Sequence, residues 1–426
     1  MTRVVAFLGA AALAESLHGR LTAAGLTTLV VDDPATGETA PSARGIAVAA
    51  QIARRVSEQE TPPAVALVRI EPDVSVMATV RSVFASAVVV VQTDGGHEHG
   101  RFFDQATFTL GPADAPDLDR LVDVLTARPH LRPNRYEQAL YLAKAASLRS
   151  AGLRGGIGCV LLDQHGDVLA AGANEVPRGG GGQYWCDSPD DSRDFHHGQD
   201  PAYVSKQATV LALLGHLTER GLYRGDDESV AADCVDFLDG NGTRAGLPST
   251  TPAVQGFESL GRVVHAELAA LAAATRHGTS VVGCEAVVTA PPCRQCLRQL
   301  IVSGVRAVRY LGTAAAGAYA FHADAITADP TEDDRMLVVP FVGVTPRGYV
   351  SAFSASTRDT GGSAPVSWRA ALELVRGAAP LEEAVRVGGA SAYGPDLVAY
   401  LNSLRRDLAD RIAGGRLDDV PGAARQ

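Results

Sequence analysis

Two short motifs carry residue types that can bind a metal ion and move protons. The first is the H-A-E of residues 265–267, and the second is the P-C-R-Q-C of residues 292–296. Each motif stands at the predicted start of a helix, and the apolar run 285–290 between those helices predicts a strand. A strand crossover would bring both helix starts to one edge of a sheet, where α/β proteins commonly place their active sites.

The chemistry of these side chains favours a catalytic zinc site. Cys293 and Cys296 are three positions apart, so both face the same way on the first helical turn, where the helix dipole favours thiolates. Two thiolates and the imidazole of His265 make three zinc ligands and leave a fourth position for water. Zinc lowers the pKa of such a water to about 7. Glu267, which is not a ligand, is then the natural proton shuttle.

A CxxC pair alone is also typical of redox centres and of structural zinc sites. A redox pair is expected in a thioredoxin-like βαβ unit without the H-x-E partner. A structural zinc site needs a fourth ligand at a fixed spacing, and none is evident in the sequence. The two motifs in this order, each opening a helix and joined by a strand, therefore predict that zinc is the cofactor and that it is catalytic.

The bulk composition restricts the partners. The chain has 426 residues with a formal net charge of -10, two lysines and 5% aromatic residues. These values disfavour a nucleic-acid surface, which needs phosphate neutralisation and stacking platforms. The six cysteines form no dense disulfide framework, and no apolar run approaches the roughly 20 residues of a membrane span. We expect a cytoplasmic protein without a membrane partner.

The order of predicted elements indicates two α/β domains. Residues 1–130 alternate apolar strands with helices, which predicts a parallel sheet covered on both faces. The first strand and helix mimic a signal peptide, but the helical pattern runs through the supposed cleavage site. A linker at 131–134 leads to a second domain at 134–355, in which residues 156–174 predict two strands around a turn at 164–167. A long insertion at about 178–262 contains a helix-like segment at 201–221 and then a loop-rich stretch to about 255. A helical extension is expected over 356–426.

Residues 134–355 resemble the deoxycytidylate deaminase branch of the cytidine deaminase superfamily. The segments that carry the resemblance are GIGCVLLDQHGDVLAAGANEVP, GRVVHAE and APPCRQC. The H-x-E and P-C-x-x-C motifs match the signature of the zinc nucleobase deaminases. NEVPRGGGGQYW, DSRDF and VVPFVGVTPRGYVSAF are similar to the two-domain anti-phage dCTP deaminases, which carry an N-terminal P-loop nucleoside-kinase-like domain.

The resemblance implies a three-layer α/β/α domain with a mixed sheet. It implies zinc at His265, Cys293 and Cys296, with Glu267 as proton shuttle. It also implies that Asn174, at the end of a strand, hydrogen-bonds the substrate sugar, although a turn asparagine is the simpler reading of that residue alone.

The N-terminal domain departs from the resemblance. A Walker A motif is G-x-x-x-x-G-K-[ST], whereas the corresponding stretch here is FLGAAALAESLHGR. Gly9 is present, but residues 1–130 contain no lysine. We therefore expect a degenerate P-loop-like domain that does not transfer phosphate and that serves structure, assembly or regulation.

The insertion supplies candidate contacts for an anionic substrate. Arginine binds phosphate bidentately, and Arg262 lies just before the H-A-E helix, so we expect it to contact the substrate. Its simpler reading is an exposed charge at a helix end. We expect Ala266, between the ligand and the proton shuttle, to contact the substrate as well. Further cations of the insertion are Arg178, Arg193 and Lys206. Cys186, His196 and His197 offer a second zinc site, although a solvated polar loop explains them equally well.

The predicted reaction is hydrolytic deamination of a free cytosine nucleotide, dCMP or dCTP, to the uracil nucleotide and ammonia. Two alternatives stay open from the sequence. One is deamination of cytosine or adenine in a polynucleotide, and the other is a non-catalytic nucleotide-sensing module. By analogy with the superfamily we expect a homo-oligomer.

Overall fold

The computed structural model divides the chain into two compact units. Unit 1 comprises Met1–Pro133 and Val342–Gln426, and unit 2 comprises Asn134–Phe341. The structure describes residues 3–8, 11–31, 41–59, 65–69, 74–84, 87–93, 102–111, 116–126, 131–152, 155–198, 200–223, 227–239, 261–314 and 317–353. The predicted helical extension at 356–426 lies outside these residues. No helix in these ranges is long and apolar enough to cross a bilayer.

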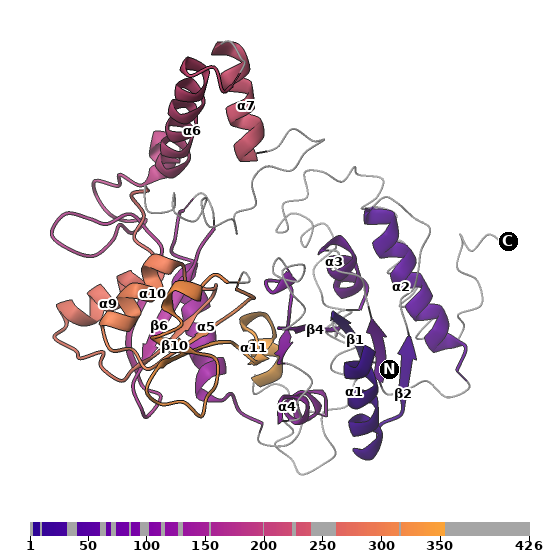
Figure 1. The fold of residues 1–426 in the computed structure, drawn as a ribbon. Coiled ribbons are helices and arrows are strands. Elements are labelled where there is room, and N and C mark those ends of the chain that lie inside the picture. The colour runs from indigo at the N-terminus through magenta and orange to yellow at the C-terminus, as the bar shows by residue number, and fades with distance from the viewer. Residues whose placement is uncertain are drawn as a thin grey trace. The chain divides into compact units, whose positions relative to one another are not determined.

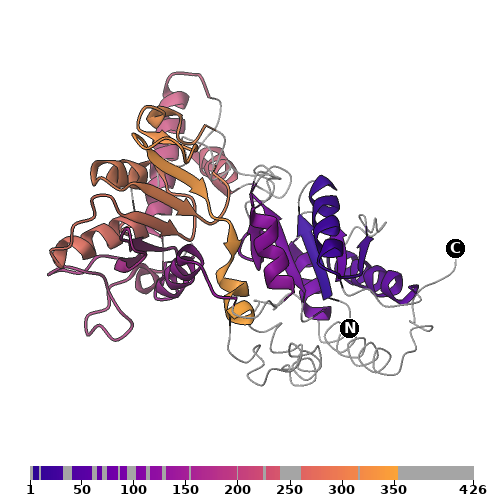
Figure 2. The same ribbon diagram turned by 90° about the horizontal axis from the view of Figure 1, so that it is seen from below.

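Unit 1 contains a six-stranded sheet in the order β12-β5-β4-β1-β3-β2 (Figures 1 and 2). The neighbouring strands from β5 to β2 pair in parallel, as the alternating sequence pattern predicted. The strands are β1 (Arg3–Leu8), β2 (Thr28–Val31), β3 (Val65–Arg69), β4 (Val88–Gln92), β5 (Phe108–Leu110) and β12 (Gly343–Val344). The helices between them are α1 (Ala11–Ala23), α2 (Pro41–Ser57), α3 (Val74–Val83) and α4 (Pro116–Leu125).

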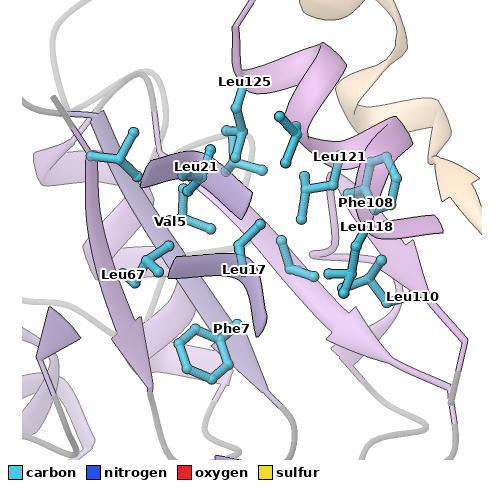
Figure 3. Close-up of a cluster of buried hydrophobic side chains, with 14 of the residues drawn as sticks. Val5, Phe7, Leu17, Leu21, Leu67, Phe108, Leu110, Leu118, Leu121 and Leu125 are labelled. Carbon is cyan, nitrogen blue, oxygen red and sulfur yellow. The ribbon is translucent and has the colours of Figure 1, made fainter. Parts of the chain in front are cut away.

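The two faces of this sheet are buried by different helices. Val5 and Phe7 of β1 point to one face, where they pack with Leu17 of α1 and Leu121 of α4 (Figure 3). The intervening residues of β1 point to the other face, because side chains alternate along a strand. Each fully buried Leu or Phe contributes about 1.5–3 kcal/mol. β1 and α1 are therefore parts of a hydrophobic core, which confirms the prediction that the chain starts with a buried strand followed by a helix.

The connection that would carry a Walker A loop is short. β1 ends at Leu8 and α1 begins at Ala11, so only Gly9 and Ala10 lie between them. A Walker A motif places four residues between its two glycines, and its lysine follows the second glycine. The connection is too short for that loop. The P-loop-like origin of unit 1 stays a prediction.

Unit 2 contains a mixed sheet in the order β10-β11-β9-β8-β6-β7. The β7-β6-β8 pairs are antiparallel and the β8-β9-β11-β10 pairs are parallel. The strands are β6 (Gly158–Leu162), β7 (Val168–Ala173), β8 (Glu285–Val288), β9 (Ala307–Tyr310), β10 (Ile326–Thr327) and β11 (Met336–Pro340). This mixed sheet is the one that the sequence led us to expect.

Helices cover both faces of the mixed sheet, which gives the predicted three layers (Figure 1). α9 (Ala266–Arg276) and α10 (Arg294–Val302) pack with Cys159 and Leu161 of β6 on one face. α5 (Arg135–Ser147) packs on the other face. α5 begins with a capping box, in which the Asn134 side chain accepts hydrogen bonds from the first-turn N–H groups.

The insertion between β7 and α9 contains a short 3₁₀ helix, η2 (Asp194–His197), and two longer helices, α6 (Pro201–Glu219) and α7 (Asp227–Asp239). α6 and α7 pack side by side (Figure 1). We predicted α6, but we expected a loop-rich stretch where α7 lies, and that expectation was wrong. Cys234 is the buried contact of α7, and its Sγ lies 3.7 Å from the Gln207 carbonyl oxygen of α6.

The end of the second domain differs from the expected boundary at 355. β12 pairs antiparallel with β5 of unit 1, with Gly343 opposite Thr109 and Val344 opposite Phe108. The helix α11 (Pro346–Phe353) follows, and Arg347 donates from Nε to the Asp104 carbonyl oxygen at 2.7 Å. Residues 343–353 thus belong to unit 1. A pairing between strands more than 230 positions apart leaves no local sequence pattern.

Candidate functional site

The two motifs lie at the N-termini of neighbouring helices. His265 is the N-cap of α9, and Cys293 is the N-cap of α10. Gly172 of β7 lets α9 approach the sheet, because a Cβ at this position would collide with the carbonyl oxygen of Ala266 and the amide nitrogen of Ala270. Glycine at position 172 therefore allows the first turn of α9 to lie directly against β7.

The three predicted ligands meet at distances that suit zinc. His265 Nδ1 lies 3.4 Å from Cys293 Sγ and 3.4 Å from Cys296 Sγ. All three ligand atoms lie within 4.8 Å of one another. Tetrahedral zinc with bonds of about 2.3 Å to sulfur and about 2.0 Å to nitrogen separates those atoms by about 3.5 Å. The donor set of the chain therefore fits a zinc ion.

This is the one group of its kind among the residues that the structure describes. Cys186, His196 and His197 are all within that part of the chain, and they do not form a second group. The second zinc site that we considered in the insertion therefore has no support. His196 instead lies with Nε2 3.3 Å from the Asp191 carboxylate.

The two thiols influence each other strongly. Hydrogen bonds from Cys296 and His265 lower the pKa of Cys293 to about 4. The hydrogen bond with Cys293, followed by burial, raises the pKa of Cys296. Deprotonation of one thiol therefore opposes loss of the proton of the other. A bound divalent cation would favour the loss of that proton as well.

Glu267 is a buried carboxyl beside the sulfurs. It is 4% exposed, and burial raises its pKa, with the negative charge of Cys293 as a further cause. Its side chain hydrogen-bonds that of Cys296. None of the ion pairs in the described ranges involves Glu267. A buried carboxyl whose pKa is raised in this way is suited to exchanging a proton.

Asn174 follows β7, and its side chain already binds its own chain. Oδ1 accepts a hydrogen bond from the Ile157 N–H at 2.6 Å, and Nδ2 donates to the Gly155 carbonyl oxygen at 3.0 Å. An amide has two N–H donors, so one is left for a ligand. The predicted sugar contact would use that second N–H.

The other two predicted contacts differ in exposure. The side chain of Arg262 is 41% exposed, with Nη1 3.4 Å from Asp194 Oδ1 and with Nη2 donating to the Ser192 carbonyl oxygen at 3.2 Å. Ala266 is fully buried as the first residue of α9. Only its backbone N–H, which has no partner within a helix, is suited to a ligand.

Tyr319 is a neighbour of the site that the sequence did not reveal. Its hydroxyl donates to the Pro292 carbonyl oxygen at 3.0 Å, next to Cys293. Burial raises its pKa, and charges on Tyr310, Glu267 and the two thiols add to that effect. Tyr319 also lines a cavity of about 440 Å³ that none of the predicted site residues lines. An isolated tyrosine in an alanine-rich stretch gives no signal of such a position.

Comparison with known proteins identifies the class of the segment that contains these residues. Residues 133–312 match the family model of the "Cytidine and deoxycytidylate deaminase zinc-binding region". This segment is less than half of the 426 residues, and it contains His265, Glu267 and both cysteines. The resemblance of residues 134–312 to the zinc-binding region of cytidine and deoxycytidylate deaminases is thus confirmed. No curated protein matches the chain.

Two solved structures are similar to part of the chain. One is dCMP deaminase from the cyanophage S-TIM5 in apo form, with 16% identity over 50% of this chain and 100% of that chain, at a TM-score of 0.26. The other is the same enzyme in complex with dCMP and dUMP, with 20% identity over 42% of this chain and 83% of that chain, at a TM-score of 0.23. Both TM-scores are low, so these likenesses support no conclusion about the substrate of this chain.

Proposed function

We propose that this chain catalyses the zinc-dependent hydrolytic deamination of a free cytosine nucleotide, dCMP or dCTP, to the uracil nucleotide and ammonia. The observation that carries the proposal is the meeting of His265 Nδ1 with two cysteine sulfurs at 3.4 Å, beside the buried carboxyl of Glu267. A structural zinc site has no use for a buried carboxyl that lacks an ion-pair partner, because the burial of such a group destabilises the fold.

The proposed roles divide between binding and proton transfer. His265, Cys293 and Cys296 would hold the zinc, which when bound supplies the charge that makes water nucleophilic at neutral pH. Glu267 would move the two protons of the attacking water, one to the ring nitrogen of cytosine and the other to the amino group, which leaves C4 as ammonia while the water oxygen stays on C4. The second N–H of Asn174 binds the sugar, and the backbone N–H of Ala266 and the guanidinium of Arg262 contact the remainder of the nucleotide.

A zinc assay combined with a deamination panel tests the proposal. We expect about one zinc per chain and ammonia release from dCMP or dCTP in a panel that also contains CMP, CTP and deoxycytidine. A short single-stranded oligonucleotide should not compete with the nucleotide. Turnover of another cytosine compound, with no ammonia from either deoxynucleotide, would contradict the proposed substrate.

The cysteines provide matched variants for the same assay. We expect Cys296→Ser to lose zinc and all measurable turnover, because a hydroxyl is a poor replacement for a thiolate ligand. Cys186→Ser serves as the control, since Cys186 is exposed and lies outside the ligand group. Zinc content measured by metal analysis should remain at the wild-type level in the control. Equal zinc content in both variants would rule out the assigned ligand set.

A further inference from the structure

A second cluster of charged side chains lies in the insertion, with Arg193 at its centre. Arg193 is 6% exposed. Its Nε donates to both carboxylate oxygens of Asp191, at 2.9 and 3.0 Å, and its Nη2 donates to Asp191 Oδ2 at 2.6 Å. Its Nη1 faces Glu175 Oε2 at 3.7 Å. A guanidinium that faces two carboxylates carries no spare charge for a phosphate, so Arg193 is not the free cation that the sequence suggested.

Glu175 connects this cluster to both sides of the proposed site. Its carboxylate is 1% exposed and accepts hydrogen bonds from the N–H groups of Ala151 at 2.7 Å and Val176 at 2.8 Å. Its backbone pairs with Val264 in both directions, at 3.0 and 3.2 Å. Glu175 follows Asn174, and Val264 precedes His265. Glu175, the partner of Arg193, thus adjoins Asn174 in the chain and is joined by backbone hydrogen bonds to Val264, the residue before His265.

Arg262 contacts the two residues on either side of Arg193. It donates to the Ser192 carbonyl oxygen and faces Asp194, which flank Arg193 on either side. Arg262 precedes His265 by three positions. Residues 191–194, which we call the clamp segment, are therefore fixed by one ion pair to the end of β7 and by another to the turn that leads to the zinc ligands.

We propose that Arg193 is a positioning residue that holds the clamp segment as one wall of the nucleotide site, beside Asn174 and the turn before His265. The inference rests on the proposed deaminase function and deepens it. Arg193 acts through Glu175 and Asp191 and does not touch the substrate. Because the clamp segment pairs with Glu175, the residue after the predicted sugar contact Asn174, its displacement weakens nucleotide binding and leaves the chemistry at Glu267 largely intact.

Arg193→Lys tests this role, since lysine retains the charge but cannot hold two carboxylate oxygens in one plane. With whichever of dCMP and dCTP the wild type deaminates, we expect KM to rise about tenfold, because small misplacements of binding groups are costly. We expect kcat to change less than about threefold and the zinc content to stay constant. Arg220→Gln, at an exposed position near the end of α6, is the control and should match the wild type.

Asp191→Asn is a second variant, which keeps the test informative if Arg193→Lys does not fold. It retains the Arg193–Glu175 pair and weakens the contacts of Asp191 with Arg193 and His196, so we expect a smaller rise of KM, about threefold, in the same direction. If both variants melt at a lower temperature but keep the wild-type KM, the contacts are merely structural and the inference is wrong. A wild-type chain that neither binds nor deaminates either nucleotide would instead remove the proposed function, and the inference with it.

Discussion

Glu267 and Glu285 are both buried carboxylates of unit 2, with exposed fractions of 4% and 3%, but their surroundings differ. Glu285 lies on β8 and points toward α5, where the Tyr136 hydroxyl donates to it at 3.2 Å. Arg306 forms an ion pair with it, and Arg309 Nε lies 3.6 Å from its second oxygen. Glu267 lies on the opposite face, beside two sulfurs and an imidazole.

The difference indicates what each carboxylate does. Glu285 forms ion pairs with Arg306 and Arg309, so it belongs to a buried charged network of the fold. Glu267 has no such partner in the described ranges, and burial raises its pKa. A buried carboxyl that keeps its charge through partners is structural, whereas one whose burial opposes the charge is suited to exchange a proton. The presence of ion-pair partners at Glu285 and their absence at Glu267, among the described residues, distinguishes the two carboxyls, although both are buried to the same degree.

The sharpest test of this contrast is Glu267→Gln. We expect kcat to fall about a thousandfold, because the amide cannot accept the proton, while zinc content is retained. A raised carboxyl pKa contributes stability below the unfolded-state pKa, and this is lost as pH rises through the folded-state pKa. At neutral pH the neutral amide should therefore fold at least as stably as the wild type. Ammonia release and calorimetric melting measure the two effects, and unchanged turnover would exclude the proton-shuttle role.

The converse variant, Glu285→Gln, should give the opposite result. Removing the shared partner of two arginines should reduce the free energy of unfolding by about 2 kcal/mol, a value below that of fully buried pairs because Arg306 is 59% exposed. Turnover per folded molecule should stay within about twofold of wild type. Denaturant titration and steady-state kinetics report these quantities. A large loss of kcat would mean that the two carboxylates are not separable in this way.

The smallest expected effect comes from Tyr136→Phe. This variant removes the hydroxyl that donates to Glu285 and accepts from Arg309 Nη2 at 3.4 Å, but it retains the ring under the Arg309 guanidinium, whose carbon lies 4.0 Å from the ring centroid. We expect a loss of about 0.5–1.5 kcal/mol in the free energy of unfolding and no change in kinetics. A double variant with Glu285→Gln should lose less than the sum of the two single effects, because the residues share one interaction.

Local sequence patterns predicted the parts of the fold that depend on local physics. Strands β1 to β4, the β6–β7 hairpin and the helix starts at His265 and Cys293 were predicted, because alternation and helix caps depend on neighbouring residues. The short strands β5 and β12 were not predicted. The meeting of His265 with two cysteines was predicted for a related reason. A helix–strand–helix path of ordinary length admits few arrangements.

The features that the sequence did not reveal depend on partners far along the chain. The pairing of β12 with β5 and the contact between Glu175 and Arg193 are not visible in either segment alone. α7 is recognisable through its packing on α6, which the sequence of α7 alone does not reveal. Asn174 was expected to face a ligand, and yet most of its amide stabilises its own turn. The contact roles of Asn174, Ala266 and Arg262 stay predictions.

The return of the chain to unit 1 after unit 2 determines the order in which the protein can be completed during synthesis. β5 leaves the ribosome early, but β12, its antiparallel neighbour, follows more than 230 residues later. Translation proceeds at about 5–20 residues per second, so β5 remains without its neighbour β12 for roughly ten seconds or longer. An unpaired edge is a site for aggregation. The interval in which the deaminase-like unit is made is therefore also the interval in which unit 1 is most vulnerable.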